Sequence, residues 1–343
     1  MRENPFTPIF FIPGFYMAAR IKVLEKQSPS DLKQAFEKDV IAGLSAAEKR
    51  IPSRYFYDDE GSRIFQEIMD LPEYYPTDCE HEILAANAGR ISGIMGADQP
   101  FRLVELGAGD GRKTRLLLDR FTGDDLGFEY VPIDISEGAM GEMIDSVVRD
   151  YPEMNATGLV CEYNHGLSFL KADQKRNLVL FLGSSIGNFT FEQAHRFCRG
   201  LRDILNPGDY LLIGFDLRKE MDVLIPAYSD SRGVTARFNL NLLERINREL
   251  GADFDLQQFS HFATYNVHSG AMESYLLSRV KQTVRIKHLD REFDFDPWEP
   301  LHTEYSWKYL SADVEDLARS NDFQTVGMFY DERRYFLNAL WRI

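Results

Sequence analysis

The chain has 343 residues, of which 44% are hydrophobic and 13% aromatic, so we expect a packed core and no global disorder. This length suits one large domain or two modest ones. The formal net charge of -15, without a cluster of Lys and Arg, argues against a nucleic-acid-binding surface, which needs positive charge to neutralise phosphates. We therefore expect a small-molecule ligand and no nucleic acid, with most of the charge serving solubility.

The cysteines and histidines do not form the patterns of a disulfide framework or a metal site. Cys79, Cys161 and Cys198 are scattered without a C-x-x-C motif, which favours a reducing cytoplasm. The seven histidines include no H-x-H or H-x-x-x-H pair, so no metal is expected. The apolar run at 9–12 is too short to span a bilayer. Residues 1–20 are predicted to form an extended arm, and a true start at Met17, without residues 1–16, is an alternative.

The predicted elements begin with helices and continue as an alternation of strands and helices. Apolar spacing predicts a helix over 31–44, with Ser30 or Asp31 as its N-cap, and further helices over 63–69 and 78–94. Then follow, in order, strand 101–106, helix 112–121, strand 129–133, helix 136–150, strands 157–161 and 177–182, helix 190–205 and strand 209–215. The continuous apolar run at 177–182 is typical of a strand covered on both faces. This pattern predicts a doubly wound α/β sheet.

The alternation is interrupted after Asp216. Residues 222–250 indicate two helices, and alternating stretches follow at 260–266, 271–281 and 283–288. The chain then returns to a helix at 313–320 and strands at 323–330 and 335–342. We therefore predict a core of 79–217 plus 309–343 and a second, mixed α+β substrate-binding lobe of 21–78 plus 218–308, after the arm of 1–20.

The most informative motif joins the strand at 101–106 to the following helix. Residues 104–111 read V-E-L-G-A-G-D-G, and three glycines in five positions let the backbone turn sharply and approach a ligand. With the helix N-terminus they form a nucleotide-sized cradle. Asp134 ends the next strand, where a carboxylate would hold a ribose diol.

The order E-x-G-x-G-x-G, with Glu105 inside the strand, resembles motif I of class I S-adenosylmethionine (SAM) methyltransferases and not the G-x-G-x-x-G of dinucleotide enzymes. SAM carries no phosphate, and acidic groups suit its ammonium and sulfonium charges. The alternative is a glycine turn that serves only chain reversal, and Asp134 at the next strand end speaks against it. The resemblance implies SAM as the cofactor of the core.

Three segments outside this motif are rich in polar and aromatic residues. They are R-Y-F-Y-D-D-E-G-S at 54–62 continuing to L-P-E-Y-Y-P-T at 71–77, G-S-S-I-G-N-F at 183–189, and the insertion after Asp216. Ligands of open α/β sheets lie outside the carboxyl ends of the strands, so Asn188 is well placed to reach a substrate.

With the glycine motif, these segments resemble the histidine-specific N-methyltransferase family, in family order from about Asp31 to the C-terminus. Its best-known member is the ergothioneine-pathway enzyme that makes hercynine, N-α-trimethylhistidine. The resemblance implies a SAM-dependent enzyme that methylates the α-amino nitrogen of histidine, to the trimethyl product. It also implies that a second lobe closes over the nucleotide site and presents the free amino acid.

The resemblance implies roles for five residues at the amino acid. Tyr74, Asn188 and Tyr228 would hold it, with Asn188 near the α-amino group and the tyrosines near the carboxylate. Tyr57 would lie close to the amine, directly or through water. Glu273 resembles the acid that binds the imidazole ring.

For SAM, the candidate residues belong to the glycine turn and the next strand ends: Glu105, Gly107, Gly109, Lys113, Asp134 and Tyr163. The family commonly has an acidic-aromatic pair near the adenine after its third strand. Here Glu162 and Tyr163 stand one position earlier.

The residue types suit the implied chemistry. Tyrosine hydroxyls supply donors for a carboxylate without a full buried charge, and the Asn188 oxygen orients the lone pair of the amine toward the sulfonium methyl. Methyl transfer is a direct displacement, so alignment does most of the catalysis. Water takes the proton of the amine, since no dedicated base is obvious. The plainer alternatives are Asn188 as a helix cap and Glu273 as an outward strand residue.

One departure bears on the substrate. Tyr275 stands two residues after Glu273, where a small polar residue beside the imidazole is expected, and a bulkier neighbour would reshape the ring pocket. The alternatives are therefore the same transfer to another aromatic amino acid or a tryptophan derivative, as in fungal relatives, and a catalytically silent SAM-binding partner subunit. We expect a cytoplasmic monomer with no membrane contact.

Overall fold

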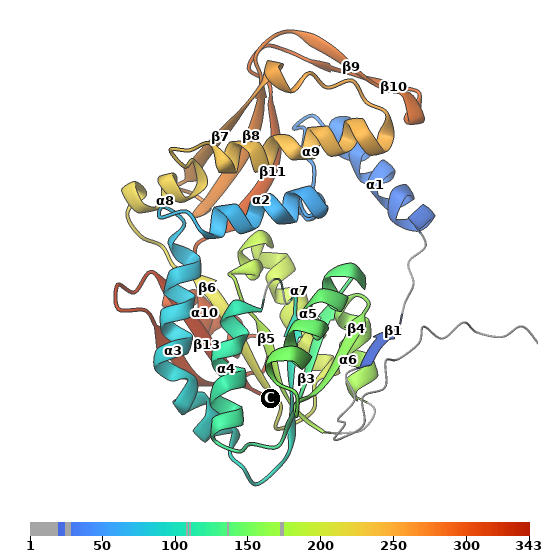
Figure 1. Ribbon diagram of the computed structural model, residues 1–343. Helices are drawn as coiled ribbons and strands as arrows, with labels where there is room; N and C mark the ends of the chain where they lie inside the picture. Colours follow the sequence, from blue (N-terminus) through green and yellow to red (C-terminus); the bar gives the residue numbers. More distant parts are fainter. Residues whose placement is uncertain (1–19, 25–28, 108, 110, 136, 172–174) are drawn as a thin grey trace, which may run out of the picture.

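An eight-stranded sheet forms the lower part of the molecule in Figure 1. The computed structural model describes residues 20–24, 29–107, 109, 111–135, 137–171 and 175–343. In spatial order the strands are β1 (Arg20–Val23), β4 (Asn155–Val160), β3 (Phe128–Asp134), β2 (Phe101–Leu106), β5 (Arg176–Phe181), β6 (Tyr210–Asp216), β13 (Phe336–Arg342) and β12 (Gln324–Tyr330). All neighbours pair in parallel except β13, which is antiparallel to β6 and β12. The predicted doubly wound α/β sheet is confirmed.

Helices cover both faces of this sheet. One face packs against α3 (Tyr75–Met95), α4 (Arg112–Gly123) and α5 (Glu137–Asp150). The other face packs against α6 (Tyr163–Leu170), α7 (Phe191–Ile204) and α10 (Ser311–Arg319). Leu103 belongs to the first hydrophobic cluster and its neighbour Val104 to the second, because successive side chains of a strand point to opposite faces. Burial on both faces explains the continuous apolar runs of these strands.

A second group of elements lies above the carboxyl ends of these strands (Figure 1). Its helices are α1 (Pro29–Leu44), α2 (Asp59–Met69), α8 (Met221–Tyr228) and α9 (Val234–Leu250), with 3-10 turns η1 (Ser53–Phe56), η4 (Leu256–Gln258) and η5 (Lys287–Leu289). Its strands are β7 (Phe259–Asn266), β8 (Ala271–Ser278) and β11 (Pro300–Trp307), in the order β11-β8-β7, and the hairpin of β9 (Gln282–Ile286) and β10 (Arg291–Phe295).

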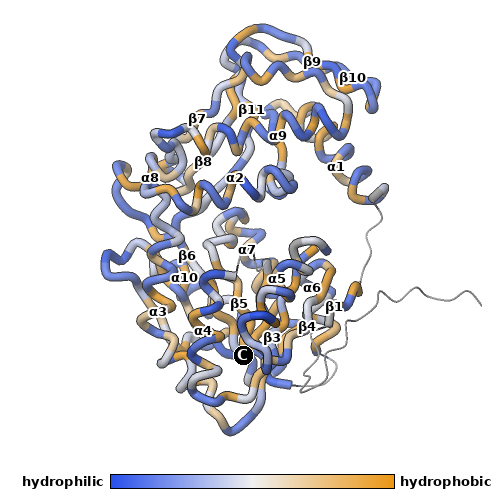
Figure 2. Tube along the Cα trace, in the orientation of Figure 1, coloured by the Kyte–Doolittle hydropathy of each residue, from blue (hydrophilic) through white to orange (hydrophobic). Residues whose placement is uncertain are grey.

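Helix α9 organises the core of this upper group. Phe238, Leu242 and Ile246 recur every four residues and are buried, so they form one apolar stripe on the helix. The tube along α9 alternates between hydrophilic and hydrophobic residues in Figure 2. The stripe packs with residues of α1, α2, β8 and β11 into a third hydrophobic cluster. Gly251, with φ of 66°, ends the helix in the left-handed conformation that glycine adopts readily.

A bulge in β11 sets which of its side chains face the helices. Leu301 pairs with Leu276, and Glu304 pairs with Ser274, so Thr303 is an extra residue between them. The Thr303 hydroxyl donates to Asn239 Oδ1 of α9 at 2.8 Å, so Thr303 and Glu304 both point to the helix side of the sheet. If Thr303 continued the strict alternation from His302 and paired with Ser274 itself, Glu304 would turn to the other face.

The elements that the sequence analysis missed are short or irregular. They are α6, the four-residue β1, and β10 and β11. The strand β1 joins the large sheet beside β4, although residues 21–78 were assigned to the second lobe. Helix α1 begins at Pro29, so Ser30 and Asp31 lie in its first turn and do not cap it. The predicted arm and the alternative start at Met17 lie outside the described residues.

Several features of the described ranges bear on membranes, metals and thiols. None of the described helices has the length and apolar character needed to cross a membrane. No group of three or more His, Cys, Asp or Glu side chains among the described residues could hold a metal ion. Cys79, Cys161 and Cys198 are buried and form no disulfide bond with one another.

Candidate functional site

The glycine turn after β2 has the backbone that its sequence predicts. Gly107, Gly109 and Gly111 have φ values of 72°, 55° and 67°, in the left-handed region that favours glycine. A Cβ at Gly107 would lie 2.7 Å from the Tyr163 hydroxyl, so a larger residue would collide with that ring. Burial, and then the charge of Asp134, raise the pKa of Tyr163 to about 12. The turn, the end of β3 and the start of α6 therefore meet at one place.

These groups fit the nucleoside part of SAM. The turn lets a ligand approach the backbone closely, Tyr163 supplies an aromatic surface, and Asp134 supplies a carboxylate at the carboxyl end of β3. This is the arrangement in which nucleotide-binding α/β folds hold a ribose. All three were predicted as cofactor-binding residues.

Glu105 and Lys113 have partners within the protein. Both oxygens of the buried Glu105 carboxylate accept hydrogen bonds, one from Thr114 and one from Tyr130. Glu105 therefore ties β2 to α4 and β3 at the base of the glycine turn. The Lys113 ammonium lies 2.5 Å from the buried carboxylate of Glu80.

Glu80 also fixes the loop after β5. Its carboxylate accepts a hydrogen bond from the backbone N–H of Gly183 at 2.8 Å and one from the Asn338 side chain at 2.9 Å. Lys113 is thereby held beside Gly183, at the carboxyl ends of the strands, with N–H groups that Glu80 does not use.

Three tyrosines and one glutamate form a cluster between the upper and lower elements. Tyr57 follows η1, Tyr74 precedes α3, Tyr228 ends α8, and Glu304 lies in β11; we call these four residues the tyrosine cluster. Desolvation is the largest cause that raises the pKa of each tyrosine well above its usual value. The next causes are the charges of neighbours, and Glu304 acts on all three tyrosines. Four separate segments therefore share one electrostatic environment.

Tyr57 joins the tyrosine cluster to the glycine turn. Its pKa responds to Glu304, Tyr74 and Tyr228, and also to Tyr163, whose hydroxyl lies beside Gly107. The Tyr57 side chain is 43% exposed, although neighbouring groups desolvate its hydroxyl. The candidate amino-acid residues and the candidate SAM residues thus adjoin at Tyr57.

Asn188 lies in the 3-10 turn η3 (Ser185–Asn188), which packs against β6 and β11. A Cβ at Gly187 would lie 3.1 Å from the carbonyl oxygen of Trp307, so the turn sits tightly on the end of β11. Thr190 caps α7 through a capping box with Gln193, so Asn188 does not serve as the cap. No hydrogen bond ties the Asn188 amide to another described residue, which leaves it available for a ligand.

Glu273 and Tyr275 lie away from the tyrosine cluster. Glu273 pairs with Tyr305, whereas Ser306 pairs with Met272, and paired residues share a face. Met272 packs in the first hydrophobic cluster, which also contains Tyr228. Glu273 and Tyr275 therefore point to the opposite face of the small sheet. There Glu273 accepts hydrogen bonds from Asn266 and Tyr275.

The expected position of Glu273 beside the amino acid is therefore corrected by the strand register. Tyr275 turns away with it, because residues two apart in a strand share a face, so the expected crowding of the ring pocket by Tyr275 does not occur.

Three residues of the site, Glu304, Ser306 and Lys308, were not predicted from the sequence. Burial raises the pKa of Glu304 to about 7, and the charge of Lys308 opposes that rise. The Ser306 hydroxyl lies 2.7 Å from the Tyr228 hydroxyl, and the Lys308 ammonium donates to Tyr228 at 2.6 Å. The segment T-E-Y-S-W-K at 303–308 alternates acidic, hydroxyl and basic residues with aromatic ones, which was the available signal for a polar strand facing a ligand.

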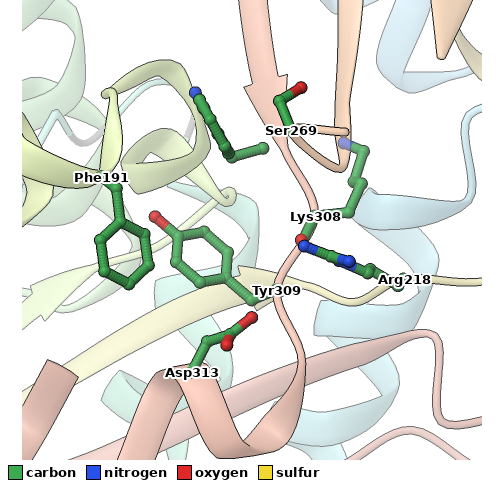
Figure 3. A pocket seen from close by; sticks show the side chains of 7 residues that line it. Phe191, Arg218, Ser269, Lys308, Tyr309 and Asp313 are labelled. Atoms are coloured by element: carbon green, nitrogen blue, oxygen red, sulfur yellow. The ribbon is translucent and has the colours of Figure 1, made fainter. Parts of the chain in front are cut away.

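A pocket of about 100 Å³ lies where the end of β11 meets the lower elements (Figure 3). Its lining residues are Phe191, Arg218, Ser269, Trp307, Lys308, Tyr309 and Asp313. In Figure 3 the Lys308 side chain runs away from Phe191, and its ammonium is bonded to Asp216, Tyr228 and Ser306. Lys308 therefore lies between this pocket and the tyrosine cluster.

Comparisons with known proteins identify the family of this chain. The family described as histidine-specific, SAM-dependent methyltransferases matches residues 36–343. Histidine N-alpha-methyltransferase of Mycolicibacterium smegmatis is 41% identical over 293 residues, covering 85% of this chain and 90% of that protein. The protein of the same name from Mycobacterium tuberculosis is 39% identical over 275 residues, covering 80% and 84%.

A longer protein, ergothioneine biosynthesis protein 1 of Schizosaccharomyces pombe, is 30% identical over 288 residues, which cover 82% of this chain and 37% of that protein. The glycine turn, the order of the eight strands and the match from residue 36 to the last residue lead to one assignment. This chain belongs to the family of histidine-specific, SAM-dependent methyltransferases.

Proposed function

We propose that this enzyme transfers methyl groups from SAM to the α-amino nitrogen of histidine, up to the trimethyl product. The relatives that are 41% and 39% identical are named histidine N-alpha-methyltransferases. The observation that carries the proposal is the position of Tyr57. Its ring packs edge-on against Phe65, which packs in the same way against Tyr74, and the groups that raise its pKa include Tyr163 at the glycine turn, Tyr228 and Glu304.

SAM would lie over the glycine turn. Gly107 and Gly109 admit it close to the backbone, Asp134 and Tyr163 hold its nucleoside, and the spare N–H groups of Lys113 hold its carboxylate. Glu105 acts indirectly, because Thr114 and Tyr130 occupy its carboxylate. When bound, SAM supplies an electrophilic methyl group on its sulfonium.

The amino acid would lie against the tyrosine cluster. The hydroxyls of Tyr74 and Tyr228 donate to its carboxylate, and Asn188 and Tyr57 orient its amine. Glu304 faces the same side and is long enough to reach the side chain of the substrate. With its pKa near 7, Glu304 exchanges protons in the same range as an imidazole, so either partner can donate in the bond between them.

The reaction is a direct displacement at the methyl carbon. The amine first loses its proton to water, and its lone pair then forms the new N–C bond as the C–S bond breaks. The products are S-adenosylhomocysteine and the N-methylated amino acid. Asn188 and Tyr57 contribute by holding the lone pair in line with the methyl group, which is the main source of rate in such transfers.

The experiment that tests the substrate is incubation of the protein with SAM and all twenty amino acids, followed by mass spectrometry. We expect mass gains of one, two and three methyl groups on histidine alone. A gain on tryptophan or another aromatic amino acid would replace histidine as the substrate. No transfer to any amino acid would support a silent SAM-binding subunit.

A second test separates the two carboxylates of the small sheet. We expect Glu304→Ala to weaken histidine binding at least ~10-fold, as the loss of a hydrogen bond to a charged group does, and to leave SAM binding unchanged. Glu273→Ala is the matched control, because it removes a carboxylate from the opposite face of the same sheet. The reverse result in calorimetric titrations would return the ring-binding role to Glu273.

We also propose that the enzyme works as a cytoplasmic monomer on this small molecule, without nucleic acid. All residues of the proposed site come from one chain, so a second copy is not required. Cysteines that form no disulfide bond with one another suit a reducing compartment. Light scattering after size-exclusion chromatography is expected to give the mass of one chain.

A further inference from the structure

Three charged side chains are buried together behind the tyrosine cluster. The carboxylate of Asp216, at the end of β6, contacts the ammonium groups of both Lys219 and Lys308. Asp216 and Lys308 are buried, and the Lys219 side chain is 3% exposed. Burial alone would raise the pKa of Asp216, but the two lysines hold that pKa below its usual value.

Each lysine of this ion cluster contacts three oxygen atoms. Lys308 donates to Asp216 at 2.8 Å, to Tyr228 at 2.6 Å and to Ser306 at 2.8 Å. Lys219 donates to Asp216, to the Tyr75 hydroxyl at 2.8 Å and to the Leu217 carbonyl at 2.5 Å. An ammonium group has one N–H group for each of its three oxygen partners. Two positive charges therefore face one negative charge.

The Lys308 ammonium orients the hydroxyl groups of Tyr228 and Ser306, because both oxygens accept its hydrogen bonds. Tyr228 and Ser306 each accept from Lys308, and their oxygens are 2.7 Å apart. A hydrogen bond between them uses the proton of one hydroxyl. The proton of the other hydroxyl has no acceptor within this group, so it is available to a ligand beside the tyrosine cluster.

We propose that Lys308 is a positioning residue that makes Tyr228 and Ser306 selective for the carboxylate of the amino acid. This inference rests on the proposed function and adds the residue that orients the hydroxyl groups of the carboxylate site. Because both hydroxyl oxygens accept from the ammonium group, the pair has one proton left to donate to a ligand. The excess positive charge of the ion cluster favours an anion as that ligand. Glu304 interacts with Lys308 but is not bonded to it, so the carboxylate of the substrate is the anion that this donor serves.

Lys219 provides a matched control within the same ion cluster. It contacts the same carboxylate as Lys308, but its other partners are Tyr75 and a backbone carbonyl. Its removal takes away one buried charge without changing a donor to Tyr228 or Ser306. If the loss of a buried charge alone weakens ligand binding, replacing either lysine will weaken it. If the hydroxyl pair is responsible, only the replacement of Lys308 will do so.

The experiment compares histidine with histidine amide, which lacks the negative charge, by calorimetric titration of the full-length protein saturated with S-adenosylhomocysteine. We expect Lys308→Met to weaken histidine binding on the order of 10- to 100-fold, the range for charge-assisted hydrogen bonds, and to change amide binding less than about 3-fold. Lys219→Met should change both ligands by the same factor. Equal losses for both ligands in Lys308→Met would overturn the proposal.

Two further measurements keep the result interpretable. If Lys308→Met fails to bind S-adenosylhomocysteine and is therefore misfolded, Lys308→Gln takes its place, because the amide keeps a neutral donor. Lys308→Gln should still lose most of the preference for histidine over histidine amide. A retained preference would refute the role of charge. In a Tyr228→Phe background the Lys308→Met effect should shrink, and an undiminished effect would contradict action through Tyr228. If the wild-type protein binds no histidine, the proposed function itself fails, which is a different result from any of these.

Discussion

Adjacent residues of one type serve different purposes at this site. Tyr74 and Tyr75 are neighbours in the sequence, yet the Tyr75 hydroxyl is buried 2.7 Å from Asp216, whereas Tyr74 belongs to the tyrosine cluster with Tyr228 and Glu304. The chain enters α3 at Tyr75, and the change of backbone direction there separates the two rings. The hydrogen bonds of Tyr75 to Asp216 give it a structural role, whereas Tyr74 remains the candidate ligand of the amino acid.

The requirement for glycine at position 107 has a residue-level test. Gly107→Ala should weaken SAM binding by at least ~10-fold, because the new methyl group would lie 2.7 Å from the Tyr163 hydroxyl and the positive φ costs a further ~1–2 kcal/mol. Titration with SAM measures the loss.

The controls divide this loss into two parts. Gly109→Ala has the same backbone cost, since its φ is 55°, but a Cβ there would meet no atom of the described part of the chain within 4 Å. Gly107→Ala combined with Tyr163→Phe removes the colliding oxygen and should regain part of the affinity, up to that of Gly109→Ala. A double variant no better than Gly107→Ala would show that the collision is unimportant.

Glu304 is predicted to destabilise the ligand-free protein at neutral and higher pH. Its pKa is raised to about 7 by burial, above the 4.5 of the free side chain, so the folded protein binds the proton more tightly than the unfolded chain. The stability that Glu304 contributes is full below pH 4.5 and is lost as the pH rises through 7.

The variant Glu304→Gln removes this dependence. At pH 8 it should be more stable than the wild type by up to about 3 kcal/mol, the value of such a pKa shift, and at pH 4 the two should be similar. Urea unfolding at a series of pH values measures the difference. A constant difference across the series would mean that Glu304 does not titrate in this range.

At the scale of elements, the large sheet was predictable and the small sheet less so. Strand 101–106 and the segments that form β3, β5 and β6 were found because burial on both faces gives continuous apolar runs. The glycine turn was found because its chemistry is local. Strand β11 was missed because Thr303 breaks its period, and the position of Glu273 was wrong because a face is set by pairing between strands, which one strand alone does not reveal.

Asn188 and Thr190 allow the capping and ligand roles to be separated within one loop. Thr190 caps α7, so Thr190→Ala should lower the free energy of unfolding by about 1 kcal/mol and leave the catalytic rate nearly unchanged. Asn188→Ala should have the opposite profile, with unchanged stability and a catalytic rate reduced at least ~10-fold through loss of alignment. Thermal unfolding and single-turnover rates with saturating SAM check both variants. A loss of stability in Asn188→Ala would indicate a structural role.

At the scale of the whole molecule, the site depends on contacts between distant segments. Tyr57 and Tyr74 lie between β1 and β2 in the chain, whereas Tyr228 and Glu304 belong to the insertion between β6 and α10. The small sheet of that insertion contains two histidines, His261 and His302, whose pKa values burial lowers to about 4. The integrity of the upper elements is thus sensitive to acid.

These histidines predict how stability changes below neutral pH. A lowered pKa means that their contribution is full above about pH 6.5 and is lost as the pH falls through 4, at most about 3 kcal/mol for each. The double variant His261→Gln, His302→Gln should therefore lose stability less steeply than the wild type between pH 6.5 and 4. Parallel curves from chemical unfolding at each pH would contradict this assignment.

The extra residue in β11 suggests how relatives of this enzyme could acquire other substrates. Deleting Thr303 would leave Glu304 opposite Ser274 on the ligand side, because the strand would then alternate normally from His302. If Thr303 stays and the bulge is flattened, the pairing of β11 slips by one residue past His302, so Glu304 turns outward and the ring of Tyr305 takes its place. Such a slip would convert an ionisable wall into an aromatic one without a substitution at position 304. Changes of register at this strand are where divergence of side-chain preference is to be sought.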